Sequence, residues 1–350
     1  EPFRAFVGDM LRKDQHSVGY AVQTAFIGAG AVVGSLFPTL MEAMGVANVA
    51  PPGQIPDTVR YAFWFGGIAL FLAVLWTAVA TDEYSPEQMA AFHPPTVEDA
   101  PAIRALASHS YASSLGWIAA GILVVLAQVE LSLLREVLLL GALLVGYGLA
   151  SIAAIALARQ GNDTNMLSSI VGDFSGMPPL MKRLALVQFF SWSALFIMWI
   201  NTTPIVAQYH FGPTDAASAA YQDAGNWVGE LFAIYNGVAA VAALTLLPWL
   251  ARRLGQARTH MIGLACGAVG YASFFVLRDP SQLIVSEIFI GIFWASVLAM
   301  PYAILASSLP QAKLGIYMGL FNVFVVVPQL LVPTVMGSIM KSLFPGEPIY

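Results

Sequence analysis

Residues 282–308 read QLIVSEIFIGIFWASVLAMPYAILASS, an apolar stretch whose only charged residue is Glu287. The hydrocarbon core of a bilayer is about 30 Å thick, so a helix needs roughly 20 apolar residues to cross it. This stretch is long enough, and it does not alternate apolar and polar residues as the strands of an outer-membrane barrel do. It therefore predicts a membrane-spanning helix.

Comparable stretches recur along the whole chain. They predict about nine complete spans of the length that a bilayer requires. The spans cover residues 17–44, 61–80, 112–129, 137–157, 184–208, 226–250, 259–277, 282–308 and 314–342. Residues 1–11 form a partial span, which we interpret as the end of a helix that begins before this sequence does. We therefore expect an all-α polytopic membrane protein.

The composition agrees with this prediction. Of the 350 residues, 58% are hydrophobic and only 10% are charged, whereas soluble proteins carry about 25% charged residues. These values exclude a cytosolic enzyme, and the net charge of −5 gives no basic surface for nucleic acid. Cys266 is the only cysteine and the histidines are scattered, so we expect no disulfide, no metal site and no cofactor.

Lysine and arginine residues gather in alternate connections between the spans, which sets the expected orientation. With the loop at residues 12–15 on the cytoplasmic side, most of them lie inside. The inside residues are Arg12, Lys13, Arg104, Arg159, Lys182, Arg183, Arg252, Arg253, Arg258 and Lys313. The opposite side receives Arg60, Arg135, Arg278 and Lys341.

Two polar connections that contain proline or glycine, at residues 81–110 and 160–183, are typical of linkers. They enclose the spans at residues 112–129 and 137–157, which contain few polar residues and which we interpret as an inserted hairpin facing lipid. The expected organisation is therefore the end of an N-terminal half-bundle at residues 1–80, the linkers with the accessory hairpin at residues 81–183, and a C-terminal half-bundle at residues 184–350.

Four segments are more specific than the apolar pattern. They read EPFRAFVGDM at residues 1–10, QFFSW at 188–192, ASVLAMPYAIL at 295–305 and GIYMGLFNVFVVVPQ at 315–329. In this order they resemble the sucrose/proton symporter family of glycoside-pentoside-hexuronide type cation symporters, which belongs to the major facilitator superfamily. The resemblance implies a bacterial-type member that contains family helices 4 to 11 and the inserted hairpin, as a fragment lacking the first helices and the last.

The resemblance also implies a function. Family members take up disaccharides such as sucrose or maltose together with protons, and carriers of this architecture hold the substrate near the bilayer midplane between two half-bundles. The implied setting is the bacterial inner membrane, with a sugar and the lipid bilayer as partners, H⁺ as the coupling ion and a monomer as the functional unit.

Other functions need different residues. A membrane sugar sensor or a uniporter would bind the same class of ligand without proton coupling. An intramembrane enzyme would need a catalytic group at depth, but no histidine is expected mid-span, and Ser191, Ser193 and Ser296 have no evident base. A channel would need a selectivity filter, and nothing in the sequence resembles one.

Arg4 is the strongest candidate for a substrate contact. It would lie roughly 10 Å inside the cytoplasmic end of its helix, where an unpaired arginine costs several kcal/mol. Glu1 precedes it by one helical turn and can pair with it, either as a static partner or as a proton carrier. The resemblance implies that the arginine holds sugar hydroxyls and that an aspartate upstream of Glu1 carries the coupling proton.

Polar side chains inside the later spans are the next candidates, because each would otherwise be unsatisfied in hydrocarbon. We expect Gln23 and Asn236 to line the cavity, whereas Asn201 and Thr202 either line it or form interhelical hydrogen bonds. Plant members of the family carry acidic residues at the positions of Asn201 and Thr203, so the charge pairing that these imply is absent here.

The span at residues 282–308 carries Glu287, Gly291, Trp294 and Tyr302 on one face. Trp294 and Tyr302 suit a sugar, because an aromatic ring stacks on its apolar face, although aromatic residues are common in any span. Glu287 is a proton-coupling candidate, and its alternative role is a carboxylate at the membrane boundary.

Two further features concern packing. Gln329 follows Pro328, and a proline leaves one backbone carbonyl of the preceding turn without its hydrogen-bond donor. The Gln329 side chain therefore either contacts the substrate or donates a hydrogen bond to that carbonyl. Gly28, Gly30 and Gly34 place small residues on the first span and predict close contact with another helix that can slide during transport.

Overall fold

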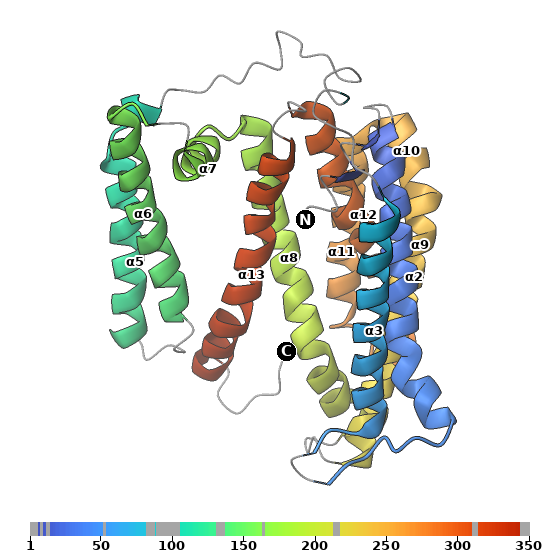
Figure 1. The fold of residues 1–350 in the computed structure, drawn as a ribbon. Helices are drawn as coiled ribbons and strands as arrows, with labels where there is room; N and C mark the ends of the chain where they lie inside the picture. The colour runs from blue at the N-terminus through green and yellow to red at the C-terminus, as the bar shows by residue number, and fades with distance from the viewer. Residues whose placement is uncertain are drawn as a thin grey trace. The chain divides into compact units, whose positions relative to one another are not determined.

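The computed structural model describes residues 6–7, 10–11, 15–51, 54–81, 88, 106–130, 137–162, 165–212, 218–309 and 314–343, with side chains up to residue 333. Every regular element in these ranges is a helix (Figure 1). The prediction of an all-α protein is confirmed. Most of the predicted linker at residues 81–110 lies outside the described ranges.

Eight helices of the described chain are long and apolar enough to cross a membrane. They are His16–Ala43, Asp57–Ala80, Ala112–Glu130, Val137–Arg159, Pro179–Phe211, Ala219–Leu244, Pro280–Ser308 and Leu314–Pro333. The ninth predicted span, at residues 259–277, forms helix α11 (Gln256–Ser273) but is not one of the eight. Its first turns carry Gln256, Arg258 and His260, which lower its hydropathy.

Contacts between helices divide the chain into two compact units. The described elements of unit 1 are the 3₁₀ turn η3 (Leu106–Ser108), α5 (Ala112–Glu130), α6 (Val137–Arg159), α7 (Met166–Ser175), α8 (Pro179–Val206) as far as Ile200, and α13 (Leu314–Leu343). Those of unit 2 are α2 (His16–Ala43), α3 (Asp57–Ala80), the end of α8, the π-helical turn η4 (Ala207–Phe211), α9 (Ala219–Leu244), α10 (Leu246–Leu254), α11, η5 (Pro280–Gln282) and α12 (Leu283–Ser308). The units interleave along the chain, and the half-bundle boundaries after residues 80 and 183 stay a prediction.

In unit 2, α2 packs along α9 (Figure 1). Gly28 allows this approach, because a Cβ atom there would lie 2.7 Å from the Asn236 carbonyl oxygen and 3.0 Å from the Ala240 Cβ. The predicted close contact is confirmed at Gly28. It is wrong for Gly30 and Gly34, where a Cβ would meet nothing within 4 Å, because these residues point to other sides of a helix with 3.6 residues per turn.

In unit 1, α5 and α6 confirm the two predicted hairpin spans as paired helices. A Cβ on Gly121 would lie 2.6 Å from the Gly141 carbonyl oxygen, and one on Gly148 would lie 2.7 Å from that of Ser114. The hydroxyls of Ser114 and Ser151 share a buried hydrogen bond of 2.8 Å. Small residues and one polar contact therefore hold this pair together, as is common for helices in membranes.

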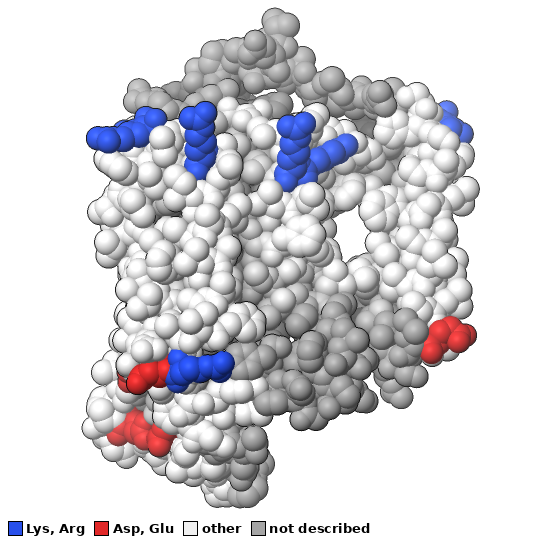
Figure 2. Space-filling model, turned by 180° about the vertical axis from the view of Figure 1, so that it is seen from behind, with Lys and Arg blue, Asp and Glu red and all other residues white. Residues whose placement is uncertain are grey.

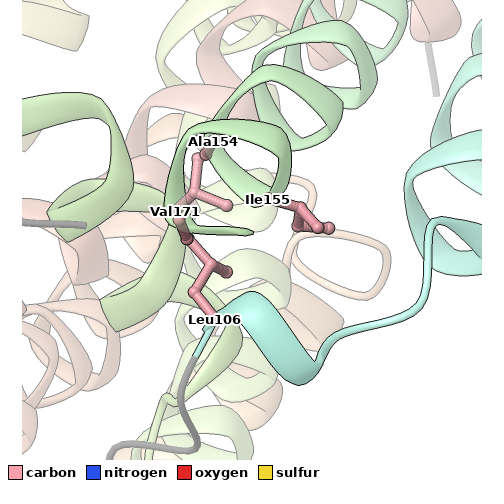
Figure 3. Packing of buried hydrophobic residues seen from close by; sticks show 5 residues of the cluster. Leu106, Ala154, Ile155 and Val171 are labelled. Carbon is pink, nitrogen blue, oxygen red and sulfur yellow. The ribbon is translucent and has the colours of Figure 1, made fainter. Parts of the chain in front are cut away.

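The predicted linker at residues 160–183 contains a helix that was not expected, α7. Its N-terminal cap is Asn165, whose side-chain oxygen accepts a hydrogen bond of 2.9 Å from the backbone N–H of Ser168. Val171 packs with Leu106, Ala154 and Ile155 in a buried cluster (Figure 3). The apolar side of α7 therefore folds this connection onto the end of α6.

The predicted span at residues 226–250 is divided into two helices. α9 ends at Leu244, and α10 begins at Leu246 after Thr245, whose φ and ψ are −115° and −67°. Pro248 lacks a backbone N–H and cannot donate to the carbonyl of Leu244, so a continuous helix would lose a hydrogen bond at this point.

Basic residues gather at one end of the helices within each unit (Figure 2). The described residues at these ends include Arg159, Lys182 and Arg183 in unit 1 and Arg252 and Arg253 in unit 2. The start of α3 carries an Arg60–Asp57 ion pair of 2.7 Å. Both units therefore have the charge asymmetry that the positive-inside rule requires.

The orientation can be checked with single cysteines in a Cys266→Ser background. A cysteine at Gln54, which is exposed after α2, should react with a membrane-impermeant maleimide on intact cells. A cysteine at Ala257, which is exposed at the start of α11, should react only after permeabilisation. The reverse labelling pattern would show that the orientation is inverted.

Candidate functional site

Helices α9 and α12 of unit 2 bring two predicted site residues into direct contact. Trp294 in α12 donates a hydrogen bond of 3.1 Å from Nε1 to Oδ1 of Asn236 in α9. Asn236 in turn donates from Nδ2 to the carbonyl oxygen of Phe232, 2.8 Å away. Both side chains are buried. The pair is therefore a polar contact inside the membrane-spanning part of the unit.

A contact between two aromatic rings joins α2 to α12 and includes the predicted site residue Tyr302. The ring of Tyr302 lies 6.2 Å from the ring of Tyr20, measured between centroids, and both side chains are buried. Gln23 follows Tyr20 by one turn of α2, is also buried, and its Oε1 has no hydrogen-bond partner among the described residues. Tyr20 was not predicted, although its spacing to Gln23 places both on one side of the helix.

Glu287 lies in the second turn of α12 and is 0% exposed. Within the described part of the chain, neither carboxylate oxygen of Glu287 has a hydrogen-bond partner. The hydroxyl of Tyr271 in α11 has no partner there either. The neighbouring Ser286 shares its hydrogen bond of 2.6 Å with Ser273 instead. An ionised carboxylate in such surroundings costs several kcal/mol, and a protonated one avoids most of that cost.

The other predicted site residues are dispersed. Asn201 and Thr202 lie in the last turns of α8, in the part that belongs to unit 2, and Thr202 is buried. Gln329 lies in α13 of unit 1 and is exposed. Arg4, the predicted sugar-binding residue, and Glu1, its predicted ion-pair partner, lie outside the described residues.

One expectation about catalytic groups is wrong. Ser296 does have a histidine beside it, because His260 Nδ1 lies 2.9 Å from Ser296 Oγ across α11 and α12. Both residues are buried, and a Cβ on Gly263 would lie 2.4 Å from the Ser296 Cβ. The pair therefore forms a buried polar contact that joins α11 to α12.

A polar network that was not predicted connects the other end of α2 to its neighbours. Asn226 of α9 and Asn48 of the loop after α2 both donate to Glu42 Oε2, at 2.5 and 3.2 Å. The Thr58 hydroxyl of α3 donates to Asn48 Oδ1 at 2.8 Å. The sequence signal is a carboxylate at the end of an apolar span, which needs partners at the membrane boundary.

Trp294→Phe is expected to lower the unfolding temperature of the protein in detergent. The substitution removes the donor to Asn236 and leaves a buried oxygen unsatisfied, which costs about 1–3 kcal/mol. Trp227→Phe in α9 is the matched control, because the Trp227 indole N–H has no hydrogen-bond partner among the described residues. Equal losses in the two variants would show that the Trp294–Asn236 bond does not stabilise the unit.

Comparison with known proteins places this arrangement in a family. The family model described as Major Facilitator Superfamily matches residues 2–333, which is most of the chain. No curated protein and no solved structure matches the chain. The matched region contains the eight helices that are long and apolar enough to cross a membrane. The chain therefore belongs to the Major Facilitator Superfamily and is an integral, multi-pass membrane transporter.

Proposed function

We propose that the protein couples the uptake of a disaccharide, such as sucrose or maltose, to the entry of protons by alternating access. The observation that carries the proposal is Glu287, a carboxylate that is 0% exposed and has no hydrogen-bond partner in the described chain. A group in such surroundings holds a proton while it is enclosed and releases it when water reaches it. A conformational change that alternately encloses and opens this region would therefore link proton transfer to transport.

Polar and aromatic side chains supply the chemistry for a sugar. The amide of Gln23 offers an oxygen without a hydrogen-bond partner among the described residues, and Trp294 and Tyr302 offer rings of the kind that stack on a sugar. Gln23, Tyr302 and Trp294 all belong to unit 2, in which α2 packs on α9 and α12 contacts both helices. Asn201 and Thr202 would add hydroxyl and amide contacts.

The proposal extends to the setting of the protein. The charge asymmetry of the helices agrees with a plasma membrane whose inner face carries the basic ends, and the sequence resemblance points to a bacterial inner membrane. We take H⁺ as the coupling ion and a monomer as the functional unit, with no cofactor and no enzymatic step. Arg4 stays the proposed grip on the sugar hydroxyls, with Glu1 as its partner.

A uniporter or sugar sensor is the second candidate. It is favoured by Asn201 and Thr203, which stand where plant members of the resembled family carry acidic residues. A chain with fewer membrane-embedded carboxylates has fewer sites that can carry a proton. Such a protein would bind the same sugars through the same amides and rings.

The test is transport by the whole protein in liposomes with an imposed pH gradient. We expect labelled sucrose or maltose to accumulate above its outside concentration when the outside is acidic, and a protonophore to abolish this accumulation. Equilibration that does not depend on the gradient would replace the symporter with the uniporter. Lack of flux with either sugar would contradict the substrate assignment.

A further inference from the structure

Unit 1 contains a cavity that takes no part in the proposed transport site. Its volume is about 680 Å³, which lies in the range of sites that bind small molecules. Side chains from α5, α6, α7, α8 and α13 line it. All of these belong to unit 1, so the cavity is formed within one compact body.

The polar side of the cavity lies at the end of the unit where basic residues gather. Lys182 near the start of α8, His109 before α5 and Ser113 in the first turn of α5 all line it. Lys182 is exposed and makes no ion pair with any residue that the structure describes. Asp173 of α7 is not a lining residue. A single positive charge therefore dominates this side.

Arg159 fixes the backbone beside the polar side of the cavity. Its guanidinium donates from Nε to the Ala107 carbonyl at 3.2 Å and from Nη2 to the His109 carbonyl at 2.9 Å. It also lies 4.4 Å from the centre of the Tyr111 ring. Because Arg159 is committed to these contacts, Lys182 is the lining cation left to meet a ligand.

Much of the remaining lining is a series of aromatic rings in contact with one another. Trp117 packs edge-on against Tyr147 at 5.5 Å, Tyr147 lies 5.0 Å from Phe174, and Phe174 stacks on Phe324 at 6.4 Å, all between ring centroids. Phe189 lies two turns beyond Lys182 in α8, roughly 10 Å deeper along the helix. Along α8 the lining therefore changes from basic at the helix end to aromatic further in, and Ser151 and Ser175 add hydroxyls among the rings.

The cavity is also open toward the surroundings of the unit. Two of its lining residues are substantially exposed, Leu186 at 60% and Trp117 at 40%. In a membrane these exposed apolar side chains would meet acyl chains. A ligand can therefore extend out of the cavity into the bilayer.

We propose that this cavity binds an anionic phospholipid from the leaflet at the basic ends of the helices. The phosphate lies beside Lys182, within reach of the Ser113 hydroxyl and the His109 ring. The upper parts of the acyl chains lie against the aromatic rings, and their ends pass Leu186 into the bilayer. The headgroup layer lies just outside a hydrocarbon core about 30 Å thick, which matches basic side chains at the helix ends and aromatic ones further in.

The first test compares two lipids that have identical acyl chains, dioleoyl phosphatidylglycerol and dioleoyl phosphatidylcholine. Native mass spectrometry of the whole protein in detergent should show about fivefold tighter binding of the anionic lipid, the effect expected for one lysine near an anionic headgroup. A photoreactive phosphatidylglycerol with its diazirine in the acyl chain should label peptides of α5, α7 or α8. Equal binding of the two lipids would overturn the proposal, and this comparison needs no variant.

Two pairs of variants locate the effect. Lys182→Ala should remove the preference for the anionic lipid, whereas Arg183→Ala should keep it, because Arg183 is the next residue, is also exposed and does not line the cavity. Ser113→Trp should fill the cavity and weaken binding of the lipid, whereas Leu115→Trp, on the same helix but outside the lining, should not. Equal effects within either pair would show a general surface effect and overturn the site.

A competition experiment distinguishes a lipid ligand from a soluble anion. Excess inorganic phosphate or glycerol phosphate should leave the bound phosphatidylglycerol in place, because neither has chains to contact the aromatic rings. Displacement of the lipid by either soluble anion would assign the cavity to a soluble phosphate compound instead. None of these readouts depends on sugar transport, so failure of the proposed function would not affect them.

Discussion

Glu287→Gln is expected to abolish accumulation of sugar driven by a proton gradient. Glutamine keeps the shape of the side chain but cannot exchange a proton, so the variant should move sugar without drawing on the gradient. A proton-motive force of 100 mV, set by the pH gradient, supplies about 2.3 kcal/mol per proton, which corresponds to roughly a 50-fold concentration ratio. We expect this ratio in liposomes to fall to about one, because an uncoupled carrier only equilibrates its substrate.

Two further measurements make this result specific to Glu287. Exchange of labelled for unlabelled sugar should continue in Glu287→Gln, which would show that the variant folds and binds its substrate. Glu230→Gln in α9 is the matched control, because Glu230 is a half-buried carboxylate of the same unit. Accumulation by Glu287→Gln at the level of the unmodified protein would remove this residue from the coupling step.

Gly28→Leu is expected to eliminate uptake and lower the unfolding temperature, whereas Gly30→Leu on the same helix should have little effect on either. Even the first side-chain carbon at residue 28 would lie 2.7 Å from the Asn236 carbonyl oxygen, and backbone cannot move aside as a flexible side chain can. Overpacking of this kind costs about 1–3 kcal/mol or more. The same carbon at residue 30 would meet nothing within 4 Å.

Gly28→Leu should reduce uptake because it displaces Asn236, a proposed site residue on α9. Pushing α9 away from α2 moves the residue whose side chain holds the Trp294 indole. Gly28→Ala should therefore show an intermediate loss of both stability and uptake, in the order glycine, alanine, leucine. Normal uptake in Gly28→Leu would show that α2 and α9 separate readily at this point and that their close packing is not required.

The membrane-spanning helices could be predicted from the sequence because their signal is local. An apolar run such as Ala112–Glu130 has one structure available in a bilayer, since a helix satisfies its own backbone hydrogen bonds. Breaks in the helices were harder to predict. Thr245 separates α9 from α10 in a stretch that is otherwise apolar from residue 237 to residue 250, and Pro248 is the main local signal of the break.

Long-range contacts could not be predicted in the same way. Asn236 and Trp294 were each selected as polar or aromatic residues inside a span, but 58 residues separate them, and no pattern along the chain connects them. The same limit applies to His260 and Ser296, 36 residues apart. The spacing of glycines in α2 predicted a close contact with another helix. That the partner is α9, and that only Gly28 touches it, depends on the rotation of α2 about its own axis.

The cavity of unit 1 was beyond prediction for a related reason. Its lining comes from five helices, and one of them, α7, lies in a stretch expected to be a linker. The local signals for α7 were present: Asn165 at a capping position, followed by Leu167 and Val171 four residues apart. Its place in unit 1 depends on Leu106, Ala154 and Ile155, which are distant in the sequence.

The hydrogen bonds from Arg159 to the carbonyl oxygens of Ala107 and His109 also indicate that the α5–α6 hairpin could be moved between proteins as one unit. The chain enters α5 and leaves α6 at the same place, an arrangement shared by surface sites that tolerate the insertion of whole domains. Because its two ends lie together, the α5–α6 hairpin can be deleted and the flanking chain rejoined by a short turn. It can also be inserted between two helices of a transporter that lacks it. The grafted hairpin would keep the preference for the anionic lipid only if the recipient also supplied counterparts of Phe174, Lys182 and Phe324.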